Sequence, residues 1–391
     1  AGRVLAAMRS THFAPGSQYS YSNGNFHILG ELAEAAAGRP LAETYRERLF
    51  DQAGMATARL AADTSQPLNG AVGYEGSDDL GFFPALNRIH WKGDAGIAAT
   101  LGDMLAWECF IDRTRDDPDG IYARLTRPQT FADGTPATYG NGLRHDRIGE
   151  FATTGHGGAL RGFRAHRLHV GAARLSVVVL FNHEGNARGA AIALAAAALG
   201  QVQPTLVGAA PDWAGNYLDE GSGLLLRLTA ETDHLGADFG GLDDRLALGA
   251  DDTAASPDMV LRREGRSMRI NRDRDGLRGL AHRLADEVRT DIAGDYDAPE
   301  PGTKLRIVDA GGRFFGAFEG FLGQGAMHQM RPVGADVWAL SCARSMDAPA
   351  PGTWTVRFRR DGGGRIGGLT LGCWLARKTD YVRHGATAIS D

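Results

Sequence analysis

The chain has 391 residues, of which 43% are hydrophobic and 23% charged, and its formal net charge is −5. A chain of this length is expected to form about two to three domains with sizeable cores. Its mildly negative charge attracts neither nucleic acid nor an anionic membrane surface. No apolar stretch approaches the roughly 20 residues of a membrane-spanning helix. The composition therefore predicts a globular protein without a nucleic-acid or membrane partner.

Cysteine usage bears on the compartment and on metal binding. Cys109, Cys342 and Cys373 are odd in number, far apart and without Cys-x-x-Cys spacing, which disfavours a disulfide framework or a zinc site. His166 and His169 have no third ligand nearby, so we expect no metal. A reducing compartment follows, and we expect the bacterial cytoplasm. The chain starts without Met, however, so a signal peptide upstream stays an alternative.

The first half of the chain predicts helices and strands mixed. Apolar residues from Phe26 to Ala36 follow helical spacing and stop at Gly38, a favourable helix C-cap. Pro40 is expected to open a second helix that extends to Leu49. Thr100-Leu-Gly-Asp103 has capping-box spacing and predicts the start of a third.

Strands and a closing helix are expected after His156. The segments Phe163–Val170 and Leu175–Phe181 read as two strands separated by a turn at Gly171. A helix from about Asn186 to Leu199 ends this half, and Pro204–Pro211 is the clearest linker in the chain.

An internal repeat follows the linker. Trp213-Ala-Gly-Asn-Tyr217 recurs as Ile292-Ala-Gly-Asp-Tyr296, and a glycine and a short apolar strand follow each copy at the same distance. The composition of this half is rich in strands and turns. Two related antiparallel β domains, each a small barrel, are therefore predicted.

Two motifs carry the candidate chemistry. Serine acyl transferases of the penicillin-recognising type combine a Ser-x-x-Lys nucleophile, a Tyr- or Ser-centred loop ending in Asn, and a Lys/His-x-Gly strand edge. Tyr21-Ser22-Asn23 matches the second motif and His156-Gly157-Gly158 the third, in the expected order. The first motif has no match, because Ile89, Pro301 and Leu375 stand three places before the only lysines, Lys92, Lys304 and Lys378. We expect either a fragment of an enzyme or a nucleophile supplied by another segment.

Each motif also has a plain structural interpretation. A phenol can act as a base when neighbouring cations lower its pKa, and an Asn amide can bind both a lysine and a substrate carbonyl. Tyr21-Ser22-Asn23 alone would nevertheless read as a turn with a packed ring. Its place between Pro15-Gly16 and an amphipathic helix favours the functional interpretation.

The His-Gly-Gly motif alone would read as a glycine-rich turn. Placed before a strand, glycines 157 and 158 let a substrate backbone approach closely. His156, mostly neutral at pH 7, holds a carboxylate less well than the lysine of a Lys-Thr-Gly strand does. This disfavours carboxypeptidase and β-lactamase activity and leaves amide or ester hydrolysis.

Several segments together carry a resemblance to a known family. They are Gln18–Phe26, Gly73–Gly76, Asn87–Ile89, Trp91–Gly96 and Thr154–Gly162. With the two predicted barrels, they resemble the D-stereospecific aminopeptidases, serine hydrolases of the penicillin-recognising, class C β-lactamase-like superfamily. The resemblance implies an α+β fold: a β-lactamase-like catalytic domain at 1–203, incomplete at its N-terminus, a β-barrel at 212–290 and a second barrel at 291–391.

The resemblance also implies an activity. A homodimeric enzyme would release N-terminal D-amino acids such as D-alanine from peptides, amides and esters, through an acyl-enzyme and without a metal or cofactor. Tyr21 would be the base, Asn23 a positioning amide, and His156, Gly157 and Gly158 the substrate-facing strand. A loop of the last barrel, Ser341–Gly352, would reach the cleft, where Asp347 would receive the substrate ammonium. Without the resemblance, Asp347 would read as a solvated turn residue.

Alternatives stay open at this point. The same fold serves esterases and D-amino-acid amidases, which differ in whether they require a free α-amine. A peptide-binding remnant that lost its nucleophile is the alternative from a different class. Because no Ser-x-x-Lys motif is present, residues 1–391 alone are expected to be inactive and to expose an open sheet edge prone to aggregation.

Overall fold

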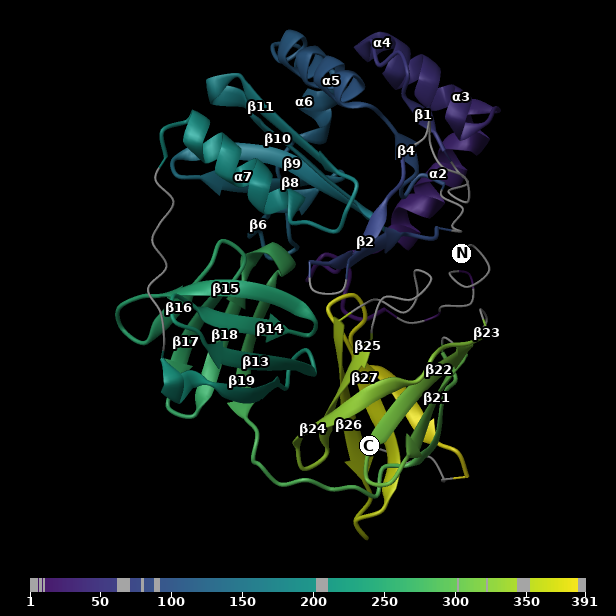
Figure 1. Cartoon of the computed structure of the whole chain (residues 1–391), viewed down its shortest axis with the longest axis vertical. Coiled ribbons are helices and arrows are strands. Elements are labelled where there is room, and N and C mark those ends of the chain that lie inside the picture. Colours follow the sequence, from purple (N-terminus) through teal and green to yellow (C-terminus); the bar gives the residue numbers. More distant parts are fainter. Residues whose placement is uncertain are drawn as a thin grey trace. The chain divides into compact units, whose positions relative to one another are not determined.

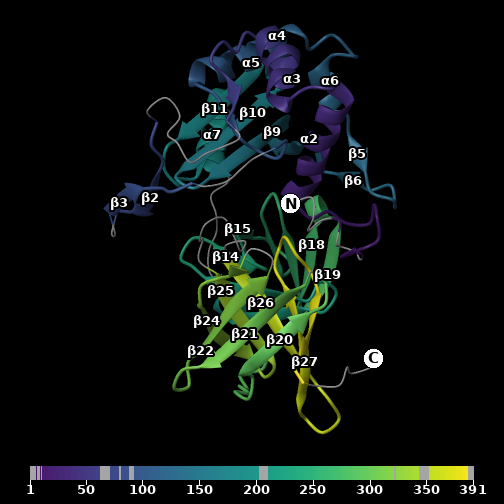
Figure 2. The same ribbon diagram turned by 90° about the vertical axis from the view of Figure 1, so that its right-hand side faces the viewer.

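The computed structural model forms two compact units (Figures 1 and 2). It describes residues 6, 9, 11–61, 71–78, 81–87, 92–201, 210–300, 302–320, 323–342 and 352–385. One unit, here the barrel unit, comprises Ala1–Tyr21, Phe131–Thr135 and Thr205–Asp391. The other, here the sheet unit, comprises Ser22–Thr130 and Pro136–Pro204. Most of the predicted linker at Pro204–Pro211 lies outside the described residues.

The helices of the sheet unit begin and end where the sequence signals stand. Gly38 caps the first with φ of 64°, as predicted. The Thr100 Oγ1 accepts from the Asp103 N–H while the Asp103 carboxylate accepts from the Thr100 N–H, which confirms the capping box. The helices are α2 (Asn23–Ala37), α3 (Leu41–Tyr45), which continues through a π-helical turn (Arg46–Phe50) into α4 (Asp51–Ala53), α5 (Leu101–Arg113), α6 (Ile121–Leu125) and α7 (Ala187–Ala198). In the described part of the chain, no helix is long and apolar enough to cross a membrane.

A five-stranded antiparallel sheet is the centre of this unit. Its order is β11-β10-β9-β8-β7, and β10 and β11 have the predicted bounds. The strands are β7 (Tyr139–Gly140), β8 (Leu143–Ile148), β9 (Phe151–Leu160), β10 (Phe163–Val170) and β11 (Leu175–Phe181). Short pairs are formed by β1 (Arg59–Leu60) with β4 (Ile97–Ala98), β2 (Tyr74–Ser77) with β3 (Gly81–Pro84), and β5 (Gln129–Thr130) with β6 (Pro136–Ala137).

Alternation along β10 directs its side chains to two different layers. Leu168 and Val170 pack into an apolar cluster with the alanines of α7, which lies across the sheet in Figure 1. Arg167 points to the other face, where its guanidinium makes two hydrogen bonds to the buried Glu108 of α5, at 2.6 and 2.7 Å. The Tyr122 hydroxyl of α6 lies 2.7 Å from Arg167 Nη1. Burial lowers the pKa of Arg167, but these bonds and charges outweigh it and hold that pKa above its usual value.

The second half of the chain forms two closed antiparallel barrels, so the predicted α+β fold with two barrels is confirmed. The first barrel consists of β12 (Gly215–Asp219), β13 (Leu224–Ala230), β14 (Leu235–Phe239), β15 (Leu242–Leu248), β16 (Thr253–Ala255), β17 (Val260–Glu264), β18 (Ser267–Arg272) and β19 (Leu277–Arg283). The second consists of β20 (Gly294–Ala298), β21 (Thr303–Asp309), β22 (Phe314–Gly320), β24 (His328–Gly334), β25 (Val337–Cys342), β26 (Gly352–Arg360), β27 (Ile366–Gly372) and β28 (Thr379–Arg383), with β23 (Gly323–Gln324) at its edge. Pairing of the first strand with the last closes each barrel.

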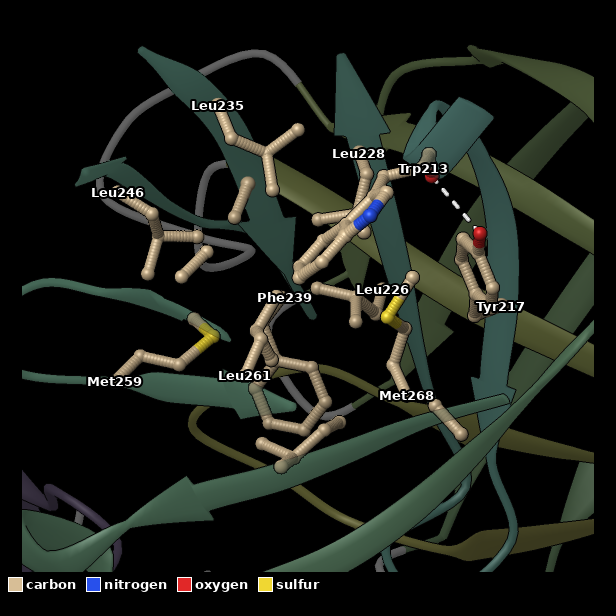
Figure 3. Close-up of a cluster of buried hydrophobic side chains, with 14 of the residues drawn as sticks. Trp213, Tyr217, Leu226, Leu228, Leu235, Phe239, Leu246, Met259, Leu261 and Met268 are labelled. Atoms are coloured by element: carbon tan, nitrogen blue, oxygen red, sulfur yellow. Dashed lines mark hydrogen bonds between the residues drawn. The ribbon is translucent and has the colours of Figure 1, made fainter. Parts of the chain in front are cut away.

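The barrels repeat one corner in detail. In the first barrel the buried Tyr217 donates its hydroxyl to the Trp213 carbonyl at 2.8 Å (Figure 3). Arg283 from the last strand lies over the Tyr217 ring, with its guanidinium carbon 5.6 Å from the ring centroid. In the second barrel Tyr296 and Arg383 occupy the equivalent places, and Tyr296 donates to the carbonyl of residue 292 at the same distance. The repeat seen in the sequence is therefore a repeat of structure.

The two barrels contact each other closely. The Thr353 hydroxyl donates to Asp238 at 3.0 Å, and the Leu225 N–H donates to the Thr355 hydroxyl at 2.9 Å. A Cβ at Gly241, whose φ is 92°, would lie 3.0 Å from the Thr353 nitrogen. Only glycine meets both the positive φ and this close approach.

Candidate active site

A partly open edge of β9 is the main feature of the candidate site. β9 pairs with β10 from Thr154 to Leu160, but its pairing with β8 ends at Gly155. Among the described residues, therefore, no strand pairs with the β8-facing side of β9 from His156 onward. Gly157 and Gly158 are exposed there. Such an edge can receive an extended peptide through main-chain hydrogen bonds.

His156 is held at this edge by both ring nitrogens. Its Nδ1 lies 2.6 Å from the Gly157 carbonyl oxygen, and its Nε2 lies 3.0 Å from the Tyr139 hydroxyl of β7. A carbonyl oxygen only accepts, so Nδ1 carries the proton. In the neutral ring Nε2 is then an acceptor, and the Tyr139 hydroxyl donates to it.

The glycines of β9 differ in how much room surrounds them. A Cβ at Gly155 would lie 2.4 Å from the Arg167 carbonyl oxygen, and one at Gly157 would lie 3.1 Å from His166 Nδ1. At Gly158 the nearest atom would be 3.6 Å away, an ordinary contact. Gly155 is therefore required for packing, whereas Gly158 leaves its space open to a ligand.

The buried His166 lies beneath the site. Burial lowers the pKa of His166 to about 4, and the positive charges of Arg188 and Arg144 act in the same direction. The ring is consequently neutral at pH 7. It is a packed core histidine, with no role in catalysis suggested by its contacts.

The turn between β9 and β10 is braced by two of the segments that carried the family resemblance, Gly73–Gly76 and Asn87–Ile89. Arg161 forms an ion pair with the buried Glu75 of β2, with Nε 2.7 Å from Oε1. The Asn87 amide donates to the Arg161 carbonyl at 3.0 Å. A Cβ at Gly73 would overlap the Phe163 ring, at 2.5 Å. The Gly73–Gly76 and Asn87 segments thus fix the C-terminal end of β9, the strand along which we expect the substrate to bind.

Asn23 occupies the first turn of α2 and is exposed. The helix is supported by the Lys92–Gly96 segment, where a Cβ at Gly93 would lie 2.5 Å from the Phe26 carbonyl oxygen. A Cβ at Gly142, in the turn before β8, would lie 3.6 Å from the Phe26 ring. The β7–β8 turn thus touches α2 one turn after Asn23, while β7 holds His156 through Tyr139.

Tyr21 and Asp347 are the remaining candidate residues. Tyr21 belongs to the barrel unit and is half-buried, with its ring centroid 6.5 Å from that of Trp374. Asn23, His156, Gly157 and Gly158 belong to the sheet unit. Asp347 lies outside the described residues.

Comparisons with known proteins agree with this architecture. Residues 3–201 match the model of the Beta-lactamase family, and residues 206–382 match that of D-aminopeptidase, domain B. A D-aminopeptidase of Cereibacter sphaeroides (strain ATCC 17029 / ATH 2.4.9) is 50% identical over 384 residues, which are 97% of this chain and 74% of that protein. A D-aminopeptidase of Brucella melitensis biotype 1 is 48% identical over 386 residues, 98% of this chain and 74% of its own length. The chain belongs to the D-aminopeptidase family.

Family membership confirms the resemblance seen in the sequence. Among solved structures, the octameric penicillin-binding protein homologue from Pyrococcus abyssi matches 83% of this chain and 64% of its own, with 16% identity and a TM-score of 0.43. Identity to the D-aminopeptidases over nearly the whole chain is what places this chain in the family.

Tyr139 and the Glu75–Arg161 pair are the parts of the site that sequence analysis missed. Tyr139 pairs with Arg144, which pairs in turn with Gly155, so its contact with His156 spans two strand pairings. Nothing in the spacing of these residues encodes that register. The Glu75–Arg161 pair could have been suspected, because both residues lie within segments already singled out.

Proposed function

We propose that this family member is a serine hydrolase that releases N-terminal D-amino acids, such as D-alanine, from peptides, amides and esters. The structural observation that supports it is the β9 edge at His156–Leu160, which contains Gly157 and Gly158 and which, among the described strands, pairs on one side only. A peptide laid along that edge would pair with main-chain groups. Gly157 and Gly158 have no side chains, so the backbone of this peptide could approach β9 closely.

The residues that we assign to the reaction follow from their chemistry. Tyr21 is the base that takes the proton of the nucleophilic serine, and Asn23 positions the substrate carbonyl through its amide. His156 holds the substrate strand, and an imidazole in this place holds a terminal carboxylate less well than a lysine ammonium does. Asp347 receives the substrate's α-ammonium, because a buried cation without a partner is costly.

The reaction proceeds in two balanced steps. The serine oxygen attacks the carbonyl of the N-terminal D-residue while its proton passes to the phenolate oxygen of Tyr21. The carbon–nitrogen bond then breaks, the amine takes this proton from Tyr21 as it leaves, and a D-aminoacyl ester of the serine forms. Water attacks this ester in the second step, so that the D-amino acid is released and the serine regains its proton.

The nucleophile is the part of this machinery that residues 1–391 do not supply. None of the three lysines completes a Ser-x-x-Lys motif, so we propose that these residues alone do not turn over substrate. The apolar strand β11 pairs only with β10 among the described strands. On α2, Leu29 and Leu32 are 54% and 59% exposed. We expect residues 1–391 alone to aggregate through such surfaces.

Assembly and location form part of the same proposal. We take the enzyme to be a homodimer, as the family resemblance implies. Cys109, Cys342 and Cys373 are free thiols, which agrees with a cytoplasmic location. Light scattering on the purified enzyme and fractionation of the source cell test the two statements separately.

The requirement for a free α-amine separates the aminopeptidase from its alternatives. The protein with its complete N-terminal sequence is given D-alanine p-nitroanilide, its N-acetyl derivative and a D-alanine ester. The proposal predicts cleavage of the free amide and ester but not of the acetylated amide. Cleavage of the ester alone would favour an esterase, and equal cleavage of both amides an amidase without amine recognition. Binding without any cleavage would favour a peptide-binding remnant.

A further inference from the structure

The loop between β27 and β28, residues 373–378, lies against the extended segment that leads to Tyr21. The Ser20 hydroxyl is within hydrogen-bonding distance of two carbonyl oxygens of this loop, those of Trp374 at 3.3 Å and Leu375 at 3.1 Å. The loop itself is fixed, since the Cys373 N–H donates to the Ala376 carbonyl at 2.6 Å. The Trp374 N–H also donates to Gly240 of the first barrel at 2.8 Å. Both barrels therefore set the position of this loop.

Arg377 is the main anchor in the loop. Its side chain is buried, with the residue 4% exposed, and Nη1 donates to the Gln18 side-chain oxygen at 2.6 Å. Nη2 donates to the Tyr19 carbonyl at 3.3 Å, and the guanidinium carbon lies 5.7 Å from the centroid of the Phe13 ring. A planar guanidinium suits this set of partners, because it donates in two directions and stacks on a ring at once.

Residues 11–20, which lead to Tyr21, form no helix or strand. Their ordered backbone relies on such contacts, among them a hydrogen bond of 2.9 Å from the Tyr19 N–H to the Asp275 carbonyl. The Tyr21 ring ends the series, tilted by 31° against Trp374. Fixing an extended segment costs conformational entropy at each residue, and these contacts supply the compensation.

We propose that Arg377 and Trp374 are positioning residues for Tyr21, so that the second barrel holds the catalytic base in place. This proposal rests on the function proposed above, in which Tyr21 takes the serine proton. It assigns a role to a loop other than Ser341–Gly352, which the family resemblance singled out. The anchor acts on residues more than 350 positions earlier in the sequence.

The test compares Arg377→Met, Arg377→Lys and Trp374→Ala in the protein with its complete N-terminal sequence. Displacing a catalytic group slows the chemical step more than it weakens binding. Arg377→Met and Trp374→Ala are therefore expected to lower kcat about 10- to 100-fold and to change KM less than about twofold. Arg377→Lys keeps the positive charge but loses the planar guanidinium that donates in two directions. Its kcat should fall between those of wild type and Arg377→Met.

Arg360→Met provides the matched control. Arg360 is also a largely buried arginine of the second barrel, but it forms ion pairs with Asp291 and Asp336. Its loss should lower thermal stability without the selective loss of kcat. Equal effects on kcat from Arg360→Met and Arg377→Met would overturn the positioning role.

Amide hydrogen exchange supplies a readout that is independent of activity. Arg377→Met should speed exchange of the amides of Tyr19 to Ser22, while exchange in the first barrel's strands stays unchanged. Unchanged exchange at these amides would contradict the proposal even if activity were lost. If wild type shows no D-aminopeptidase activity, the proposed function fails, and the exchange experiment still decides whether the loop fixes this segment.

Discussion

The Tyr139 hydroxyl lies 3.0 Å from Nε2 of His156, while Nδ1 of the same ring is satisfied by a carbonyl oxygen of its own strand. The imidazole is thus fixed in orientation and tautomer before any substrate arrives. Tyr139→Phe removes one neutral hydrogen bond and keeps the edge-on ring contact. Such a bond contributes about 0.5–1.5 kcal/mol, which corresponds to a roughly 2- to 12-fold fall in kcat/KM.

The measurement is the hydrolysis rate of a D-alanyl amide by the complete protein. Tyr45→Phe is the control, since the Tyr45 ring packs on Phe50 among the helices of the same unit. Equal activity of Tyr139→Phe and wild type would show that this contact does not serve the reaction.

Two glycines of β9 should separate folding from substrate binding. In Gly155→Ala the new methyl would collide with the Arg167 carbonyl oxygen, so we expect a marked loss of thermal stability. In Gly158→Ala the methyl has room, so the protein should fold normally but lose on the order of tenfold in kcat/KM. Thermal unfolding and steady-state kinetics of both variants test this. Unimpaired kinetics in a folded Gly158→Ala variant would argue against substrate binding along this edge.

The lowered pKa of the buried His166 should make the stability of the protein depend on pH. This pKa is lowered from 6.5 to about 4 in the folded protein, so between these values the unfolded chain binds more protons than the folded one. Stability should therefore rise with pH across this window, and the contribution of His166 is lost as pH falls from 6.5 toward 4. The size is at most about 3 kcal/mol, since one pKa unit corresponds to 1.36 kcal/mol.

Urea unfolding gives the free energy of unfolding of wild type and of His166→Gln at each pH from 4 to 7. The contribution of His166 is the difference between the two proteins in how steeply this free energy changes with pH. Asp103 does not affect the comparison. Burial raises its pKa, but hydrogen bonds from Thr57 and Thr100 more than offset this and leave the pKa below its usual 3.8. Its contribution to stability is lost from about pH 5 downward, but equally in both proteins, so it cancels in their difference. If the free energy of unfolding changes with pH equally in the two proteins, the pKa of His166 is not lowered by folding.

The repeated tyrosine corner predicts equal effects in the two barrels. Tyr217→Phe and Tyr296→Phe each leave a buried carbonyl without its donor, at a cost of about 1–3 kcal/mol in the free energy of unfolding. The two sites share no hydrogen-bond partner, so their effects should add in the double variant. Chemical denaturation of all three variants measures this. A large cost in one barrel only would show that the repeat is not energetically equivalent.

Local signals in the sequence sufficed for much of the fold. Gly38, the Thr100–Asp103 box and the alternation in Phe163–Val170 act over a few residues, so helix ends and strand bounds could be predicted. The Trp213 and Ile292 segments revealed the two barrels, because their corner geometry depends on the same few residue types. The pairing of strands that are far apart in the chain could not be predicted from the sequence. The contacts of Tyr139 with His156 and of Arg377 with Gln18 therefore emerged only from the structure.

Stereospecificity tests the central claim most directly. Initial rates with D-alanine p-nitroanilide and L-alanine p-nitroanilide are measured for the protein with its complete N-terminal sequence and for residues 1–391 alone. The account predicts turnover of the D-isomer only, by the complete protein only. Turnover of the L-isomer at a similar rate, or activity of residues 1–391 by themselves, would contradict it.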